Sequence, residues 1–188
     1  MKALGIDHLV IGKGNHGDKT ISVNALTDAE MSIADGISTN VPGISLGITQ
    51  ADCQAAIFYD PVKHAFANVH CGWRGNVQDI FGKTVEYMRG HYGSNPKDLL
   101  VCVSPSLGPE SSEFVNYRKE LPESFLEFQF KPTYFDLWEI SRWQLKNAGV
   151  LPHHIEIAGI DTFADDDYFS YRRDKACGRQ ATICCLQG

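Results

Sequence analysis

The segment ADCQAAIFYDPVKHAFANVHCGWRG, residues 51–75, contains two short apolar runs, Ala55–Tyr59 and Ala65–Val69. Asp60-Pro61 stops the first run, and a short, bounded apolar run of this kind is typical of a buried strand. The five residues Asp60–His64 are short enough to connect the two runs directly. The segment therefore predicts a β-hairpin whose two strands lie antiparallel.

Further strands and helices are predicted on both sides of this hairpin. Gln78–His91 gathers its apolar residues on one helical face, and Asp136 is placed to cap a helix through Ala148 that stops at Gly149. A shorter helix is predicted at Pro122–Phe130. The other predicted strands are Leu9–Ile11, Ile21–Val23, Ile44–Thr49, Leu99–Val103, Ile155–Ile160 and Ala181–Leu186. Because strands and helices interleave without strict alternation, we expect an α/β (α+β) fold with mixed sheets and helices packed outside them.

Length and composition indicate one globular domain, spanning residues 1–188. Of the residues, 43% are hydrophobic and 21% charged, and the formal net charge is −6. That charge argues against nucleic acid or an anionic membrane as a partner. No apolar run approaches the ~20 residues needed to cross a bilayer, and no secretory leader is visible, so we expect a cytoplasmic protein. The six cysteines are irregularly spaced, which indicates reduced thiols rather than a disulfide framework. The oligomeric state stays open.

Cys53 and His70 flank the hairpin at positions that its geometry brings together. Cys53 precedes the first strand and His70 follows the second, and in an antiparallel pair these two ends lie side by side. Three interpretations are open: a buried thiol beside a hydrogen-bonded imidazole, a nucleophile with its base, or two ligands of one metal ion. The pair taken alone favours the first.

His16, in the glycine-rich stretch GKGNHGD, supplies a third group. A loop histidine between glycines is by itself most simply a solvated side chain. Together with Cys53 and His70, however, it completes a set of two imidazoles and one thiolate. Three protein ligands leave one tetrahedral position open, as in catalytic zinc sites, and the same donors also suit copper.

Arginines supply the candidate anion-binding groups. Arg74 lies in CGWRG, where glycines let the backbone approach a ligand and a planar guanidinium can grip a phosphate or carboxylate. Arg172 and Arg173 lie in YFSYRRDKACGRQ among aromatic side chains that suit a nucleoside. A salt-bridged surface turn beside the acidic run Asp165–Asp167 is an equal alternative for this second group.

Seven motifs, taken in order, resemble one family. They are ADG (34–36), PGISLGITQADC (42–53), YDP (59–61), ANVHCGWRG (67–75), GP (108–109), FDLW (135–138) and FSYRRD…GRQA (169–181). The ordered set resembles the multicopper polyphenol oxidase, or laccase, domain, also known as the YfiH-like or peptidoglycan-editing-factor family. The resemblance covers most of the chain from about His16 onward. Members of the family usually carry a longer segment before their HG motif, so we expect part of that segment to be lacking here.

The resemblance implies the YfiH-like layered fold, in which packed mixed sheets are covered by helices. It also implies a metal pocket whose family ligands fall here on His16, Cys53 and His70. Members are described as enzymes that phosphorolyse adenosine, inosine and methylthioadenosine and that deaminate adenosine. A copper-dependent laccase activity is the competing description.

We therefore predict a zinc-dependent purine nucleoside phosphorylase and adenosine deaminase. Cys53, His70 and Arg74 are its expected catalytic residues, and Arg74, Arg172 and Arg173 are expected to bind the nucleoside and phosphate. Zn²⁺ is the expected cofactor, with Cu²⁺ as the alternative. The competing functions are a copper-dependent polyphenol oxidase, which the total of seven histidines disfavours, a metal-free cysteine hydrolase using Cys53 and His70, and a binding protein without turnover.

Overall fold

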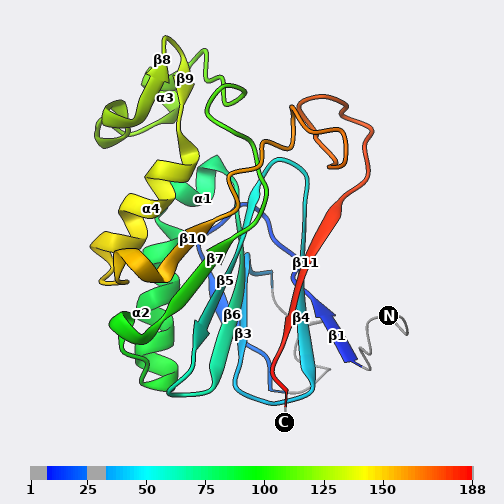
Figure 1. Cartoon of the computed structure of the whole chain (residues 1–188), viewed down its shortest axis with the longest axis vertical. Helices are drawn as coiled ribbons and strands as arrows, with labels where there is room; N and C mark the ends of the chain where they lie inside the picture. The colour runs from blue at the N-terminus through cyan, green and yellow to red at the C-terminus, as the bar shows by residue number, and fades with distance from the viewer. Residues whose placement is uncertain (1–7, 25–32, 188) are drawn as a thin grey trace.

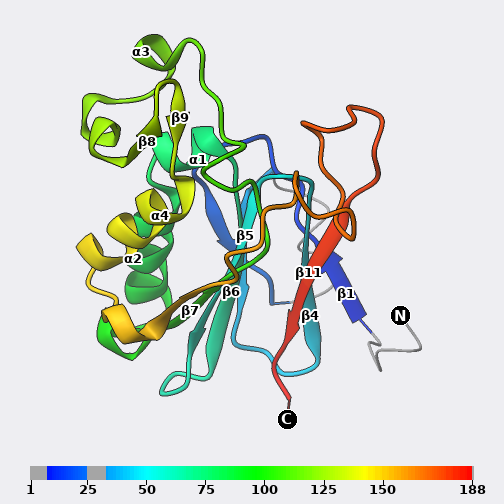
Figure 2. The ribbon, with the colours of Figure 1, turned by 45° about the horizontal axis from the view of Figure 1, so that its top comes forward.

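A six-stranded mixed sheet forms the middle layer of the structure, a computed structural model that describes residues 8–24 and 33–187. In spatial order its strands are β10 (Ile155–Ile157), β7 (Leu100–Val103), β5 (Gln54–Asp60), β6 (Ala65–Cys71), β3 (Gly36–Thr39) and β2 (Thr20–Ser22). A second sheet, which packs on one face of the first, consists of β1 (His8–Ile11), β4 (Ile44–Gln50) and β11 (Gln180–Cys185). The opposite face carries α2 (Ile80–Tyr92) and α4 (Leu137–Asn147), as Figures 1 and 2 show. The expected α+β fold of packed mixed sheets with helices outside is confirmed.

The predicted hairpin is the pair β5 and β6, with Gln54 opposite Cys71 and Asp60 opposite Ala65. Both faces of this pair are buried. Alternate residues such as Phe58 face the helices, whereas the intervening residues, such as Phe66, face the three-stranded sheet. Burial on both sides explains why these strands read as continuous apolar runs instead of an alternating pattern.

The long helices largely agree with the sequence prediction. Two amide hydrogens at the start of α4 bond to the Asp136 carboxylate at 3.0 Å, so this cap is confirmed. The predicted helix start at Gln78 is wrong. Asp79 has a φ of 54° and separates a short α1 (Trp73–Val77) from α2.

Two further predictions differ from the structure. The helix expected at Pro122–Phe130 is a 3₁₀ turn, η4 (Glu123–Phe128), followed by β8 (Gln129–Lys131), which pairs with β9 (Tyr134–Phe135). The strand β3 (Gly36–Thr39) was not predicted from the sequence, because it is only four residues long and two of them are polar. It lies between β6 and β2 and is buried throughout. The remaining short elements are η3 (Pro96–Asp98), α3 (Tyr117–Glu120) and η5 (Pro152–His154). Over residues 8–24 and 33–187, no helix has the length and apolar character that crossing a membrane requires.

Candidate metal centre

The end of β6 places His70 on the face that is covered by the three-stranded sheet. Side chains alternate along a strand, so Val69 and Cys71 pack toward the helices while His70 points the other way. The His70 amide donates to the Asp35 carbonyl oxygen at 2.8 Å, which fixes this strand end against the start of β3. The imidazole Nδ1 lies 2.8 Å from Asp35 Oδ1.

The fully buried Asp35 carboxylate also organises the loop that carries His16. It accepts hydrogen bonds from the amides of Asn15 and His16, both at 3.0 Å, and of Gly17 at 2.8 Å. His16 itself has a φ of 62°, in the left-handed region. One carboxylate thus holds both histidines in place. Burial opposes its ionisation, but the hydrogen bonds from His70 and from the loop amides lower the pKa of Asp35 below its ordinary value.

The structure brings His16, Cys53 and His70 together. One donor atom from each lies within 4.8 Å of the other two, and this is the only such group of three or more His, Cys, Asp or Glu residues in the part of the chain that is described. The two imidazole rings have centroids 5.0 Å apart and planes at 81°. Cys53 reaches this point because it directly precedes β5, whose start lies beside the end of β6.

Charge interactions within the group favour a thiolate. Burial would raise the pKa of the Cys53 thiol, but hydrogen bonds from His16 and His70 and the charges of both rings lower it to about 7. Burial would lower the pKa of His70, but the hydrogen bonds to Asp35 and Cys53 raise it to about 9. Near neutral pH, the metal-free pair therefore holds a substantial fraction of thiolate beside an imidazolium.

The donors fit a metal ion of the zinc or copper type. Two imidazoles and a thiolate are ligands that both ions accept. The hydrogen bond from His70 Nδ1 to Asp35 leaves Nε2 available to a metal ion, and a carboxylate behind a histidine ligand is the usual way in which such a ligand is oriented. Asp35 was not predicted as a site residue from the sequence, although it lies in the ADG motif, residues 34–36.

A cavity of about 420 Å³ opens beside this group. Its walls combine aromatic rings with positive charge. Trp73 and Phe114 meet edge to face at 6.0 Å between ring centroids, and the Arg74 guanidinium lies 4.3 Å from the Trp73 ring centroid. Arg172 and Lys175 complete the positive part of the wall.

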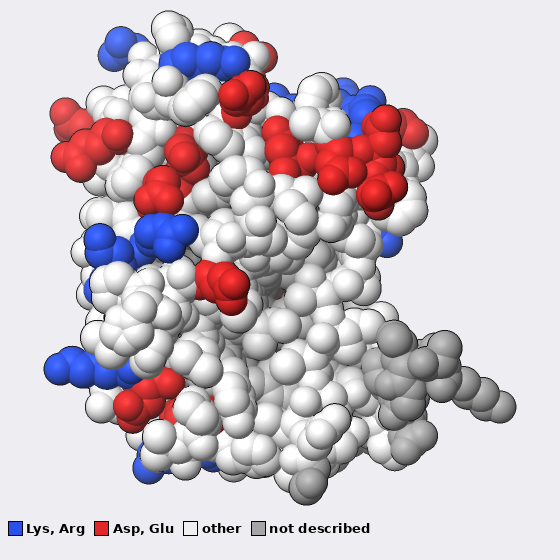
Figure 3. Space-filling model, viewed as in Figure 1, with Lys and Arg blue, Asp and Glu red and all other residues white. Residues whose placement is uncertain are grey.

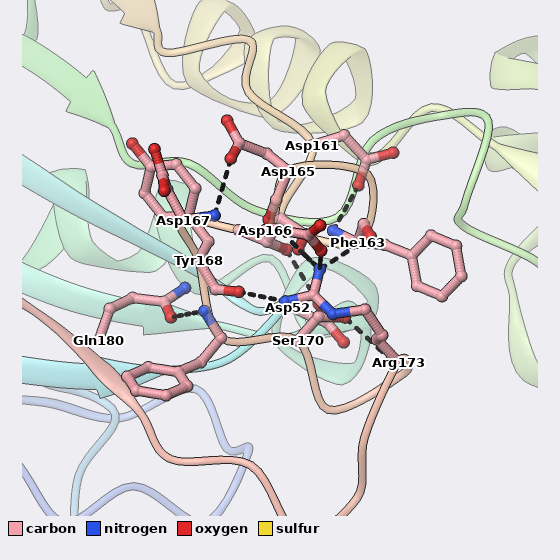
Figure 4. Close-up of polar contacts among 12 residues, drawn as sticks. Asp52, Asp161, Phe163, Asp165, Asp166, Asp167, Tyr168, Ser170, Arg173 and Gln180 are labelled. Atoms are coloured by element: carbon pink, nitrogen blue, oxygen red, sulfur yellow. Dashed lines mark hydrogen bonds and ion pairs between the residues drawn. The ribbon is translucent and has the colours of Figure 1, made fainter.

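Arg172 and Arg173, in the loop between β10 and β11, point to different surroundings. Arg172 lines the cavity, and its backbone amide donates to Asp52 Oδ2 at 2.6 Å. Arg173 is not among the lining residues. Its guanidinium donates instead to carbonyl oxygens of its own loop, those of Thr162, Phe163, Asp165 and Tyr168, at 2.5–3.3 Å (Figure 4). The structure therefore brings Arg74 and Arg172 to the cavity, whereas Arg173 stabilises the conformation of its own loop by hydrogen bonds.

Comparison with known proteins identifies the family of the chain. The family described as "Multi-copper polyphenol oxidoreductase laccase" matches residues 1–187. A "Purine nucleoside phosphorylase" from Bacteroides thetaiotaomicron is 32% identical over 171 residues, which cover 84% of this chain and 62% of that protein. A second, from Xylella fastidiosa, is 30% identical over 181 residues, covering 89% of this chain and 68% of that protein.

Solved structures show the same fold. The crystal structure of Bacillus licheniformis "hypothetical protein YfiH" superposes with a TM-score of 0.88 at 26% identity, covering 99% of this chain and 78% of that one. The chain spans 62% of the length of the Bacteroides relative, so it corresponds to part of that protein. The match over residues 1–187 shows that the chain belongs to the multi-copper polyphenol oxidoreductase laccase family, whose relatives include proteins named purine nucleoside phosphorylase.

Proposed function

We propose that this protein is a metal-dependent purine nucleoside phosphorylase. Its substrates are adenosine, inosine and methylthioadenosine, and it also deaminates adenosine. The observation that carries the proposal is the convergence of His16, Cys53 and His70 beside an aromatic-lined cavity. The relatives supply the reaction class by their names. We assign Zn²⁺ to the three ligands, with copper as the alternative.

The cavity offers surfaces for each part of a nucleoside substrate. A purine is flat and aromatic, and the edge-to-face pair of Trp73 and Phe114 provides rings against which it packs. Arg74 and Arg172 line the same cavity and present charged, planar donors to anionic or hydroxyl oxygens. We assign them to binding of the nucleoside and phosphate.

Phosphorolysis exchanges one bond at C1′ of the sugar. An oxygen of HPO₄²⁻ forms a bond to C1′ while the bond from C1′ to the purine nitrogen breaks. The electron pair of that bond leaves with the purine, and the proton of the hydrogen phosphate ends on the base. The second product is ribose 1-phosphate from adenosine or inosine and 5-methylthioribose 1-phosphate from methylthioadenosine. In deamination, a water oxygen bonds to purine C6 and the amine leaves as ammonia. The residues contribute mainly by positioning the reactants and stabilising charge.

The chain's own residues prepare the metal ligands for this chemistry. Asp35 holds the Nδ1 proton of His70, so Nε2 keeps its lone pair for the ion. The lowered pKa of Cys53, about 7, favours the thiolate that a metal requires. When bound, the metal ion supplies Lewis-acid polarisation.

The test is release of free base from each of the three nucleosides by zinc-loaded protein in the presence of phosphate. Cys53→Ser and His70→Ala should lose zinc and base release together. Cys102→Ser, at an exposed thiol on β7 away from the cavity, is the matched control and should keep both. Zinc-loaded wild-type protein that releases no base from any of the three nucleosides would overturn the proposal, and oxygen uptake with a phenol would favour the copper oxidase.

One observation favours a second candidate, a metal-free cysteine hydrolase. Cys53, His70 and Asp35 form a chain in which an acid orients a base beside a thiol of lowered pKa, the arrangement of an activated nucleophile. The two candidates respond differently to a chelator. Removing metal should abolish phosphorolysis, whereas a cysteine hydrolase would stay active. Alkylation of Cys53 should stop both activities, so the chelator is the test that separates them.

A further inference from the structure

A second cavity, of about 720 Å³, also borders the candidate metal centre. All three proposed ligands line it, whereas His16 and Cys53 line the aromatic cavity as well. Arg74 and Tyr171 are also shared by both walls. The metal centre therefore stands at the junction of two chambers, which we call the aromatic chamber and the second chamber.

The walls of the second chamber carry three cationic side chains and no carboxylate. Lys13, Arg74 and Arg179 line it, and no Asp or Glu does. Within residues 8–24 and 33–187, none of these three cations forms an ion pair. Arg179 uses one nitrogen, Nη1, for Cys177 and Gly178, whose carbonyl oxygens lie at 3.0 and 2.8 Å. Its Nη2 and Nε make no hydrogen bond to any described residue.

This concentration of cations is local. The chain as a whole has a net charge of −6. Acidic side chains gather on the exposed surface of the loop that precedes β11 (Figure 3), where Asp165, Asp166 and Asp167 lie. Arg179, at the end of the same loop, faces the chamber. Unpaired cations in one cavity of an otherwise acidic protein indicate a site for a specific anion and not a general basic surface.

An unpartnered polar atom in the same wall also points to a ligand. Gln50, the last residue of β4, lines the chamber and is only 3% exposed. Its Nε2 donates to Thr182 Oγ1 at 2.8 Å, but its buried Oε1 has no hydrogen-bond partner among the residues that the structure describes. A buried acceptor left unpaired costs free energy. Rotation of the Gln50 amide toward the chamber would let Oε1 accept from the O–H of a hydrogen phosphate ion.

We propose that the second chamber is the phosphate subsite, bound by Lys13, Arg74 and Arg179, while the nucleoside base occupies the aromatic chamber. The inference rests on the proposed phosphorolysis and adds Lys13 and Arg179 to its binding residues. Phosphate in the second chamber and the base in the aromatic chamber would place the sugar C1′ at the shared wall, between the attacking and leaving groups. Arg172 then belongs to the nucleoside side.

The experiment measures KM for inorganic phosphate and for inosine separately. Lys13→Gln and Arg179→Gln each remove one charge-assisted contact, so each should raise the phosphate KM roughly tenfold with inosine KM nearly unchanged. Lys175→Gln is the matched control, because Lys175 is a cation that lines the aromatic chamber alone. An unchanged phosphate KM in both test variants, or an equal rise in the control, would overturn the assignment while leaving phosphorolysis intact.

Direct binding separates this inference from the proposed function. If the wild type cleaves no nucleoside, calorimetric titration with inorganic phosphate still decides: weaker binding by the Lys13→Gln/Arg179→Gln protein upholds the subsite, and equal or absent binding overturns it. A titration with adenosine 5′-monophosphate distinguishes the source of the phosphate. Should only the nucleotide's affinity depend on Lys13 and Arg179, the chamber holds a nucleotide phosphate and the assignment to inorganic phosphate is wrong.

Discussion

Replacing Asp35 with asparagine tests whether one buried carboxylate holds the metal ligands in position. The two carboxylate oxygens accept from His70 Nδ1 at 2.8 Å and from three loop amides at 2.8–3.0 Å. An asparagine amide keeps one acceptor oxygen and turns an NH₂ group toward the remaining donors, so it loses the bonds on one side whichever way it rotates. Loss of such a partner behind a ligating histidine typically costs 10- to 100-fold in metal affinity, or about 1.4–2.8 kcal/mol. The lost charge-assisted bonds, worth about 1.5–3 kcal/mol each, should also lower the free energy of unfolding.

The assay is competition for Zn²⁺ between the protein and a chromophoric chelator near neutral pH. Asp18→Asn is the control, because Asp18 lies on the same loop but pairs with Lys83 and does not contact His70. Asp35→Asn should bind zinc 10- to 100-fold more weakly than the wild type, and Asp18→Asn should match the wild type. If Asp35→Asn protein is folded, as verified by circular dichroism, and keeps the wild-type zinc affinity, then Asp35 does not hold the metal ligands in position.

Three other predictions concern the same region. In metal-free protein, alkylation of Cys53 by iodoacetamide should increase as pH rises through about 7, because the thiolate forms there. It should precede alkylation of Cys102, whose pKa is raised by the partial burial of its sulfur and by the charge of Glu156. A Cys53 midpoint near that of an ordinary thiol contradicts this. Gly72→Ala places a Cβ 3.0 Å from Cys53 Sγ and should lower the free energy of unfolding by about 1–3 kcal/mol, measured by thermal unfolding. Gly90→Ala, in open space on α2, is the control and should be neutral or stabilising by up to about 1 kcal/mol. Equal melting temperatures of the two variants would contradict the close packing at Gly72. The pKa of Asp35 is lowered in the folded state, so the ionised carboxylate stabilises the fold above its unfolded pKa and this stabilisation is lost on acidification. The free energy of unfolding of Asp35→Asn should therefore fall less than that of the wild type as the pH is lowered below about 4. An equal fall in both proteins would show that Asp35 does not cause the acid sensitivity.

The sequence predicts those parts of the site that depend on local pairing. The hairpin follows from two adjacent apolar runs, and its antiparallel register brings Cys53 beside His70 without further information. The role of Asp35 depends instead on the pairing of β3 with β6, between residues that are far apart in the chain. A four-residue strand with polar members carries too weak a periodicity for that pairing to be predicted.

The two adjacent arginines show a second feature of the site that could not be predicted from the sequence, namely the direction of side chains in an irregular loop. Arg172 and Arg173 have the same chemistry and neighbouring positions, so the sequence gives no reason to separate them. The loop backbone decides their roles: Arg172 lines the aromatic chamber, and Arg173 is enclosed by carbonyls of residues 162–168 (Figure 4). The direction of a side chain in an irregular loop depends on turns whose dihedral angles no residue pattern in this segment specifies.

The most direct test of the metal centre is element-specific anomalous scattering from crystals of the protein, recorded at the zinc and copper absorption edges. We expect one anomalous peak, bonded to His16, Cys53 and His70 at ~2.0–2.3 Å. A peak at other residues, or no peak in protein that releases purine base from inosine and phosphate, would contradict it.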